Sequence, residues 1–212
     1  MAVAGPERRR LVEAVSHESE DELVNITVEP ATGQRWDDVV GVFAGRGGST
    51  CWCQRFCRPG GTDKPTALRH EIERADAPVG LIAYVDDEPA GWSRVVLRTS
   101  LPGIVQNRAL QRLYAQDEAH LAWWISCFAV LRAHRGGGVG VSLLRAATQF
   151  AQRQGGSVLD GHPVDVDRLS RRPSPAAVFT GTMSMFRAAG FHEIGRTYPS
   201  RPVMRRFLER VG

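Results

Sequence analysis

The sequence predicts an α/β domain built on a mixed, mostly antiparallel central sheet with helices on both faces. Short β-rich runs recur along the chain, and stretches with one apolar helical face stand between them. Two of these runs flank an acidic turn at residues 86–89, as in an antiparallel hairpin. A nearly continuous apolar run at residues 121–131 is typical of a central strand that is covered on both faces.

The composition is that of a globular protein. The chain has 212 residues, of which 42% are hydrophobic and 24% charged, enough to bury a sizeable core. No apolar run approaches the roughly 20 residues that span a bilayer, so we expect no membrane segment. Residues 1–22 are polar and lack the apolar stretch of a secretory signal. We therefore expect a flexible leader at 1–22, one domain at 23–212, and a cytoplasmic location.

The net charge of +4 (27 basic minus 23 acidic residues) is modest. Nucleic-acid binding usually needs a dense basic stripe, and none is continuous here, so we expect no nucleic-acid partner. Lys64 is the only lysine, so we expect arginines to make the cationic contacts to anions. Arginine binds phosphate and carboxylate bidentately. The arginines gather in three groups: Arg132, Arg135 and Arg145; Arg168, Arg171 and Arg172; and Arg201, Arg205 and Arg206.

Periodicity and turn signals give the expected elements. The expected strands are residues 23–28, 80–85, 90–97, 121–131, 157–161, 191–197 and 203–208. The expected helices are residues 34–44, 66–74, 139–154 and 182–189, with a further helical stretch near 108–114. Asp63 stands ahead of Pro65 as a helix cap, and the Pro- and Arg-rich residues 165–177 predict a loop.

The most informative unit is the apolar strand at 121–131, the glycine-rich turn that follows it, and the helix at 139–154. The turn reads Arg-Gly-Gly-Gly-Val-Gly from Arg135 to Gly140. A helix N-terminus presents unpaired amides and a partial positive charge, which together attract anions. Glycines let these amides approach a phosphate closely, and Arg135 adds a charged contact. The unit therefore predicts a site for a phosphorylated cofactor.

Two common phosphate-binding patterns do not fit this turn. The dinucleotide fingerprint needs a third glycine where Val141 stands, and the Walker pattern needs a lysine that is absent. The pattern that fits is Arg/Gln-x-x-Gly-x-Gly/Ala after a hydrophobic strand, which resembles the pyrophosphate loop of the GNAT superfamily of N-acyltransferases. Val-Leu-Arg-Ala-His-Arg at 130–135 is similar to the family's Val-x-Pro-x-x-Arg, with Arg132 in place of the proline. Met-Phe-Arg-Ala-Ala-Gly-Phe at 185–191 resembles its later Leu-Tyr-x-x-x-Gly-Phe signature. The likeness covers about residues 24–208.

The resemblance implies a GNAT-like sheet and acetyl-CoA as co-substrate. In this family the central strand bulges two residues after the position of Phe128 and splays from its neighbour, and pantetheine pairs with the strand there. A strand N–H would also stabilise the tetrahedral oxyanion formed when a neutral amine attacks the thioester directly. The implied cofactor-binding residues are Phe128, Ala129, Val130, Arg135, Gly136, Gly137, Gly138, Val139, Gly140 and Val141. The expected activity is N-acetyl transfer to a primary amine of a small molecule or protein.

An alkyl ammonium must lose its proton before attack, so the reaction needs a base or a water relay. Family members often keep an acidic residue on the central strand, but residues 121–130 contain none. Glu118 and His120 precede that strand, while Asp160 and His162 end the next one and would lie beside the gap. We favour Asp160 and His162, although such residues more often serve as solvated carboxylates or hydrogen-bonded histidines.

The family's usual acid for the departing thiolate is a tyrosine, and Phe186 occupies that position. Ser184, Tyr198 or water would have to substitute. This departure leaves a second interpretation open, namely a catalytically weak domain that binds or senses acyl-CoA. Dimers are common among such folds, so a homodimer is also possible.

Three cysteines stand close together as Cys51-x-Cys53-x-x-x-Cys57. No nearby histidine or Cys-x-x-Cys completes a standard zinc set, and Cys127 is remote in sequence, so we expect no metal. A reducing cytosol also disfavours disulfides. We expect these thiols and Trp52 to pack an acceptor pocket.

Overall fold

The computed structural model describes residues 25–44, 51–57, 63–114 and 121–209. The expected leader at 1–22, together with Glu118 and His120, lies outside the described residues. The strands are β1 (Ile26–Pro30), β2 (Gly80–Val85), β3 (Glu88–Leu97), β4 (Ala122–Val130), β5 (Val158–Gly161), β6 (His192–Tyr198) and β7 (Arg201–Phe207). The α-helices are α1 (Trp36–Val42), α2 (Lys64–Arg74), α3 (Pro102–Val105), α4 (Arg108–Gln111), α5 (Val139–Arg153) and α6 (Met183–Ala188). Short 3-10 turns are η1 (Gly33–Arg35), η3 (Arg98–Ser100), η5 (Arg132–His134), η6 (Val166–Arg168) and η7 (Pro175–Val178).

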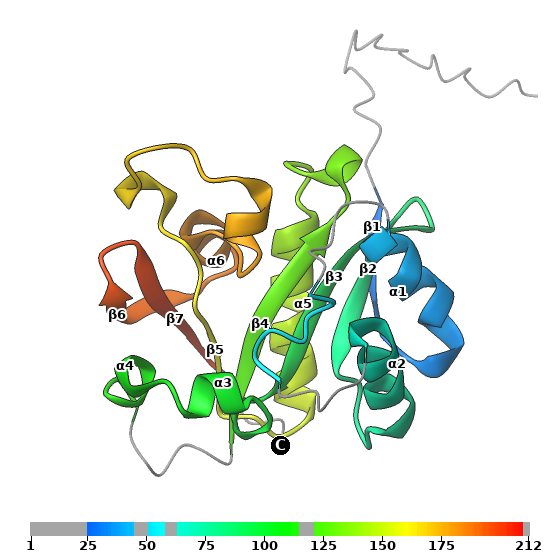
Figure 1. Cartoon of the computed structure of the whole chain (residues 1–212), viewed down its shortest axis with the longest axis horizontal. Helices are drawn as coiled ribbons and strands as arrows, with labels where there is room; N and C mark the ends of the chain where they lie inside the picture. The colour runs from blue at the N-terminus through cyan, green and yellow to red at the C-terminus, as the bar shows by residue number, and fades with distance from the viewer. Residues whose placement is uncertain (1–24, 45–50, 58–62, 115–120, 210–212) are drawn as a thin grey trace, which may run out of the picture.

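The strands form one sheet in the order β1-β2-β3-β4-β5-β7-β6. Only β4 and β5 pair in parallel, and every other neighbouring pair is antiparallel. The pairing of β4 with β5 stops at Ile125↔Gly161, and beyond that point the two halves of the sheet diverge (Figure 1). The predicted mixed, mostly antiparallel sheet is therefore confirmed.

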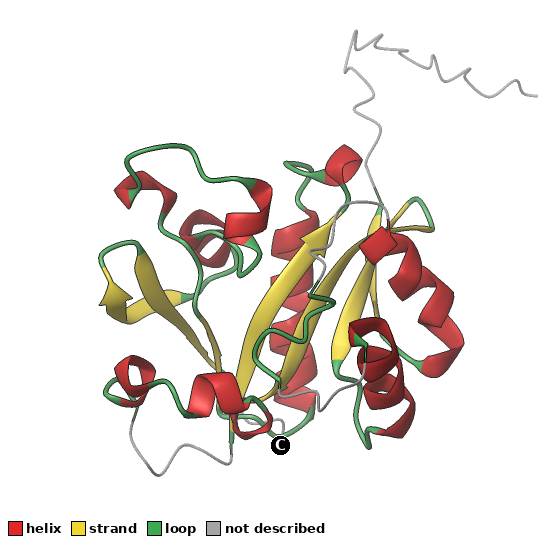
Figure 2. Cartoon of the chain, in the orientation of Figure 1, coloured by secondary structure: helices red, strands yellow, loops and turns green. Residues whose placement is uncertain are grey.

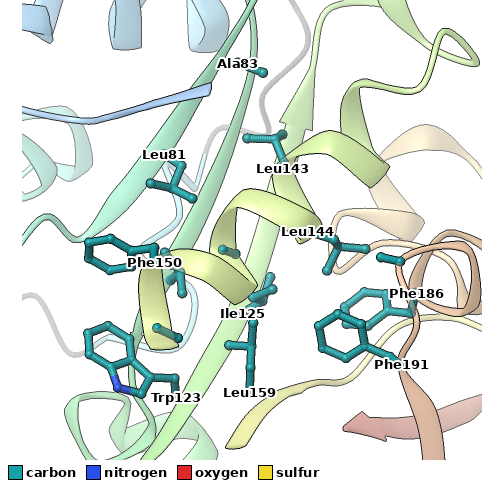
Figure 3. Packing of buried hydrophobic residues seen from close by; sticks show 14 of the residues in the cluster. Leu81, Ala83, Trp123, Ile125, Leu143, Leu144, Phe150, Leu159, Phe186 and Phe191 are labelled. Carbon is teal, nitrogen blue, oxygen red and sulfur yellow. The ribbon is translucent and has the colours of Figure 1, made fainter. Parts of the chain in front are cut away.

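Helices cover both faces of the sheet (Figure 2). Alternate residues of the central strands point to opposite faces, so each face has its own apolar cluster. Helix α5 packs on one face, where Phe150 lies edge-on to Trp123 of β4 and Leu143 and Leu144 belong to the same buried cluster (Figure 3). Helices α1 and α2 and the short helices α3 and α4 cover the other face, where Trp92 and Trp124 are buried.

Local sequence signals explain the best-defined turns. The side chain of Asp63 accepts a 3.0 Å hydrogen bond from the amide of Thr66, so it caps α2 as expected. Asp86 and Asp87 both adopt positive φ between β2 and β3, a conformation that aspartate tolerates in tight hairpins. The predicted helix at 34–44 begins as the turn η1 and becomes α-helical at Trp36. Within the described residues, none of the helices is both long and apolar enough to cross a membrane.

Candidate active site

The glycine-rich turn leads from β4 into α5. Gly136 and Gly138 have φ values of +86° and +87°, a left-handed conformation that favours glycine. Gly138 is the N-cap of α5 and supplies no capping side chain. The first intrahelical bond runs from the amide of Ser142 to the carbonyl of Gly138 (3.0 Å), so the amides of Val139, Gly140 and Val141 lack helical acceptors. The start of α5 is therefore open to an anion.

Arg135 is tied to the end of β4. Its Nε donates a hydrogen bond to the main-chain carbonyl of Val130 (3.0 Å). The residue is exposed, and its side chain lines a cavity beside the turn. This bond fixes the stem of the side chain and leaves the terminal nitrogens for a negatively charged ligand.

The cavity has a volume of about 780 Å³, which is within the range of small-molecule sites. One wall is the turn and the first residues of α5, and the opposite wall comes from the long connection between β5 and α6. That opposite wall consists of Val166, Arg172, Pro173, Val178, Phe179, Gly181 and Thr182. Phe128, Val130 and Met185 provide apolar surface between the two walls. The cavity thus has cationic groups at the turn and apolar groups along β4.

Eight of the ten cofactor-binding residues predicted from the sequence line this cavity. They are Phe128, Val130, Arg135, Gly136, Gly138, Val139, Gly140 and Val141. Gly137 does not line it and is exposed to solvent. Ala129 pairs with Trp92 across to β3, and its side chain is buried on the face of α1 and α2. The structure therefore does not bring Ala129 to the cavity.

The irregularity in β4 differs in position from the expected one. The register between β3 and β4 shifts between Arg94↔Cys127 and Val95↔Ile125, which makes Ser126 the extra residue. The bulge therefore falls two residues before Phe128, and the expectation of a bulge two residues after it is wrong. Because β5 also stops pairing at Ile125, the edge of β4 is free of β5 from Ser126 onward.

Part of that edge is occupied by the chain itself. The amide of Phe128 donates a 2.6 Å hydrogen bond to the carbonyl of Phe179. A parallel bridge between Val164 and Thr182 holds the same connection beside the extension of β5. In an antiparallel ladder, residues two apart direct their amides to the same side, so the amide of Val130 faces this edge too.

Asp160 is fully buried, with 0% exposure, and is held by two arginines. Arg205 donates to both carboxylate oxygens (2.8 and 3.0 Å), and Arg98 lies 3.6 Å from Oδ2. The residue does not line the cavity. This geometry is that of a buried structural ion-pair cluster, in which both oxygens already accept charged hydrogen bonds.

His162 lies next to Arg201 and Thr197. One ring nitrogen is 2.7 Å from Thr197 Oγ1, and the other is 3.4 Å from a terminal nitrogen of Arg201. Burial, together with the positive charge of Arg201, lowers the pKa of His162 to about 4. The imidazole is therefore neutral at neutral pH, and it is a weak proton acceptor.

Ser184 and Phe186 both belong to α6 but have different surroundings. Ser184 is exposed, and its hydroxyl lies 3.1 Å from that of Thr182, the N-cap of the helix. Phe186 has 0% exposure and packs edge-on against Phe128 and Phe191. Tyr198, by contrast, is 69% exposed. None of Asp160, His162 and Ser184 lines the cavity, and the structure does not gather them around it.

The cysteine segment is joined to the central strand. Cys53 forms a disulfide with Cys127, the residue before Phe128, so the expectation that these thiols stay reduced is wrong. Trp92 donates from Nε1 to Cys53 Sγ (3.1 Å), and Trp52 stacks on Phe43. Cys51 and Cys57 are not part of a disulfide, and within the described ranges no set of three His, Cys, Asp or Glu residues could hold a metal ion.

The second wall of the cavity was not predicted from the sequence. Arg172 and Thr182 contribute polar side chains to it, and Phe179 and Met185 contribute apolar ones. The arginine group at 168–172 is a sequence signal for this wall, since Arg172 lines the cavity. Residues 165–177 have no helical or strand periodicity, so their fold-back toward α5 could not be read from the pattern.

Comparison with known proteins identifies the family. The family model described as "Acetyltransferase (GNAT) family" matches residues 50–167, which is more than half of the chain. The chain therefore belongs to the GNAT acetyltransferase family, as its glycine-rich turn and its later Gly-Phe signature predict. A search of curated proteins gives no match.

Solved structures of this family share the fold. The GNAT domain of S. lividans PAT is 17% identical with a TM-score of 0.53, and the match covers 85% of this chain and 89% of that chain. The protein yncA from Salmonella typhimurium, solved with its cofactor acetyl-CoA, is 16% identical with a TM-score of 0.52, covering 88% and 95%. The paia N-acetyltransferase from Thermoplasma acidophilum, in complex with coenzyme A, is 13% identical with a TM-score of 0.51, covering 86% and 99%.

Proposed function

We propose that the chain is an N-acetyltransferase that moves an acetyl group from acetyl-CoA to a primary amine of a small molecule or a protein. The observation that carries this proposal is the cavity between the uncapped start of α5 and the connection from β5 to α6. The family match and the structures solved with acetyl-CoA or coenzyme A support it. We keep the cytoplasmic location and the homodimer as predictions.

The lining of the cavity fits both ends of acetyl-CoA. At the turn, the amides of Val139, Gly140 and Val141 and the guanidinium of Arg135 would hold the pyrophosphate. Arg172 on the opposite wall adds a second cation. Along β4, Val130, Phe179 and Met185 offer the apolar surface that a pantetheine arm requires.

Within this proposal, the chemistry is direct attack of a neutral amine on the thioester through a tetrahedral intermediate. The amide of Val130 faces the free edge of β4 and would donate to the developing oxyanion. The amide of Phe128 would join it only after the carbonyl of Phe179 has moved away. Asp160 is bound by arginines and His162 has a pKa of about 4, so we assign the removal of the ammonium proton to solvent rather than to either of them.

A second function is favoured by specific contacts. A buried phenylalanine, Phe186, occupies the position of the tyrosine that serves as the family's general acid. The carbonyl of Phe179 also occupies the hydrogen bond of the Phe128 amide. Both features are compatible with a domain that binds or senses acyl-CoA and turns over slowly. Tight binding of acetyl-CoA without release of free CoA from any amine would select this second function.

The test is calorimetry with acetyl-CoA, followed by an assay of free CoA with a panel of amines. Arg135→Gln should weaken acetyl-CoA binding by about 10- to 100-fold, the value of a hydrogen bond to a charged group. Arg145→Gln changes an exposed arginine of α5 that does not line the cavity, and should leave the affinity unchanged. No measurable affinity in well-folded wild-type protein would overturn the proposal.

A further inference from the structure

Two arginines from distant parts of the chain contact Phe179 and Thr180, the segment whose carbonyl accepts the hydrogen bond of the Phe128 amide. Arg201, at the start of β7, donates to the carbonyl of His162 (2.8 Å) and to Thr180 Oγ1 (3.1 Å). The guanidinium carbon of Arg55 lies 5.4 Å from the centre of the Phe179 ring. Because Phe179 and Thr180 are adjacent and Phe179 bonds to Phe128, both cations lie beside the free edge of β4.

Neither of these arginines pairs with a carboxylate in the part of the chain that the structure describes. Among the residues that the structure describes, no carboxylate lies within 4.0 Å of the guanidinium of Arg55 or Arg201. The buried arginines, by contrast, do have carboxylate partners. Arg94 pairs with Glu71, and Arg98 and Arg205 pair with Asp160.

The half-buried guanidinium of Arg201 therefore has no counter-ion among the described residues. Burial lowers the pKa of Arg201, and the neighbouring charge of Arg55 lowers it further. Two like charges near one another destabilise the charged state unless an anion lies between them. Within the described residues the guanidinium of Arg201 contacts neutral groups, namely the Thr180 hydroxyl and the ring and carbonyl of His162, so it retains N–H donors for an anionic ligand.

We propose that the acceptor amine carries a carboxylate, as a free amino acid does, and that Arg55 and Arg201 bind this carboxylate. The inference rests on the proposed function and adds the substrate class. The planar guanidinium group matches a carboxylate with two parallel hydrogen bonds. Arg55 is exposed and Arg201 is half-buried, so the carboxylate can be reached from solvent and held beside the edge where the acetyl group would lie. Phe56 and Phe179, whose rings are 6.2 Å apart, offer apolar surface next to the two cations.

The experiment compares free amino acids with their amides, which keep the amine but lose the carboxylate. Wild-type protein should acetylate the amino acids with a higher kcat/KM than the matching amides. Arg55→Gln and Arg201→Gln should each lower kcat/KM for the amino acids by about tenfold or more, the loss of a charged hydrogen bond, and change the value for the amides little. The affinity for acetyl-CoA should stay the same, and Arg201→Lys should recover part of the activity.

A second measurement does not require turnover. N-acetyl amino acids, the products of this reaction, should raise the melting temperature of the wild-type protein with coenzyme A present, and should not do so in Arg55→Gln. Equal rates for amino acids and amides, equal slowing of both by the variants, or no difference in melting temperature would overturn this inference. If the wild-type protein shows no measurable affinity for acetyl-CoA, the proposed function is overturned instead, so the two failures are distinguishable.

Discussion

The amide of Phe128 donates a 2.6 Å hydrogen bond to the carbonyl of Phe179. The strand edge where the family pairs pantetheine is therefore partly filled by the connection between β5 and α6. One N–H cannot serve both acceptors at full strength, so pantetheine must displace Phe179 in order to use Phe128.

This competition predicts a change in amide hydrogen exchange. Binding of acetyl-CoA should speed exchange in residues 178–182, which leave β4, and slow it in residues 136–141, which gain a ligand. Mass-spectrometric exchange with and without acetyl-CoA tests both directions. Slower exchange in both segments would show that Phe179 keeps its place when the cofactor is bound.

Gly138 should be needed for binding more than for folding. Gly138→Ala places a Cβ at φ +87°, which costs about 1–2 kcal/mol, although the nearest atom, Ile26 Cδ1, would be 3.8 Å away. The strained turn would misdirect the first amides of α5, and we expect affinity for acetyl-CoA to fall by about tenfold. Gly155→Ala is the matched control, since Gly155 has φ +75° in open space at the other end of α5. It should show a similar loss of stability and no change in affinity.

Asp160 should be a structural residue. Asp160→Asn removes the negative charge between Arg98 and Arg205, both of which are buried. We expect the free energy of unfolding to fall by about 3–5 kcal/mol, the usual effect of leaving a buried charge without its counter-ion. Glu193→Gln in the exposed pair with Arg196 should cost about 1 kcal/mol or less. Urea unfolding measures both, and abolished turnover with unchanged stability in Asp160→Asn would identify Asp160 as the base after all.

His162 should make stability depend on pH. Its folded pKa is about 4, below the value of 6.5 expected in the unfolded chain, so the unfolded chain binds more protons between these values. The free energy of unfolding should therefore be highest above pH 6.5 and fall as the pH drops toward 4, by at most about 3 kcal/mol. His162→Gln should flatten this dependence, whereas His192→Gln, which changes an exposed histidine of β6, should not. Urea unfolding across this pH range gives the comparison.

The disulfide should contribute strongly to stability. Cys53 and Cys127 are 74 residues apart, so the loop-entropy estimate for their bond is about 4 kcal/mol. Reduction, or the double substitution Cys53→Ala with Cys127→Ala, should lower the melting temperature. Cys57→Ser, at a cysteine outside the disulfide, is the control. Equal melting temperatures with and without reductant would contradict this prediction.

Much of the fold was predictable from local patterns. The apolar stripe of α5, the acidic hairpin turn after β2 and the cap at Asp63 each depend on residues close in sequence. One wall of the cavity was predictable for the same reason, because Arg135 and the glycines after it form a single turn.

The remaining features depend on contacts between distant segments. Cys53 and Cys127 are 74 residues apart in the sequence, and Asp160 meets Arg205 because β7 lies next to β5. The bulge at Ser126 is a property of the register between two strands, which no single segment encodes. The return of Phe179 to β4 likewise leaves no periodic signal in residues 165–177.

The connection between β5 and α6 contributes to both the proposed acetyl-CoA site and the proposed acceptor site. It supplies Arg172 to the cavity, the Phe179 carbonyl to β4 and the Thr180 hydroxyl to Arg201. A donor molecule that shifts Phe179 will also shift the hydroxyl that orients Arg201. Thermodynamic linkage then requires each substrate to alter the dissociation constant of the other by the same factor. Calorimetry of each substrate with and without the other should accordingly give the same factor in both directions.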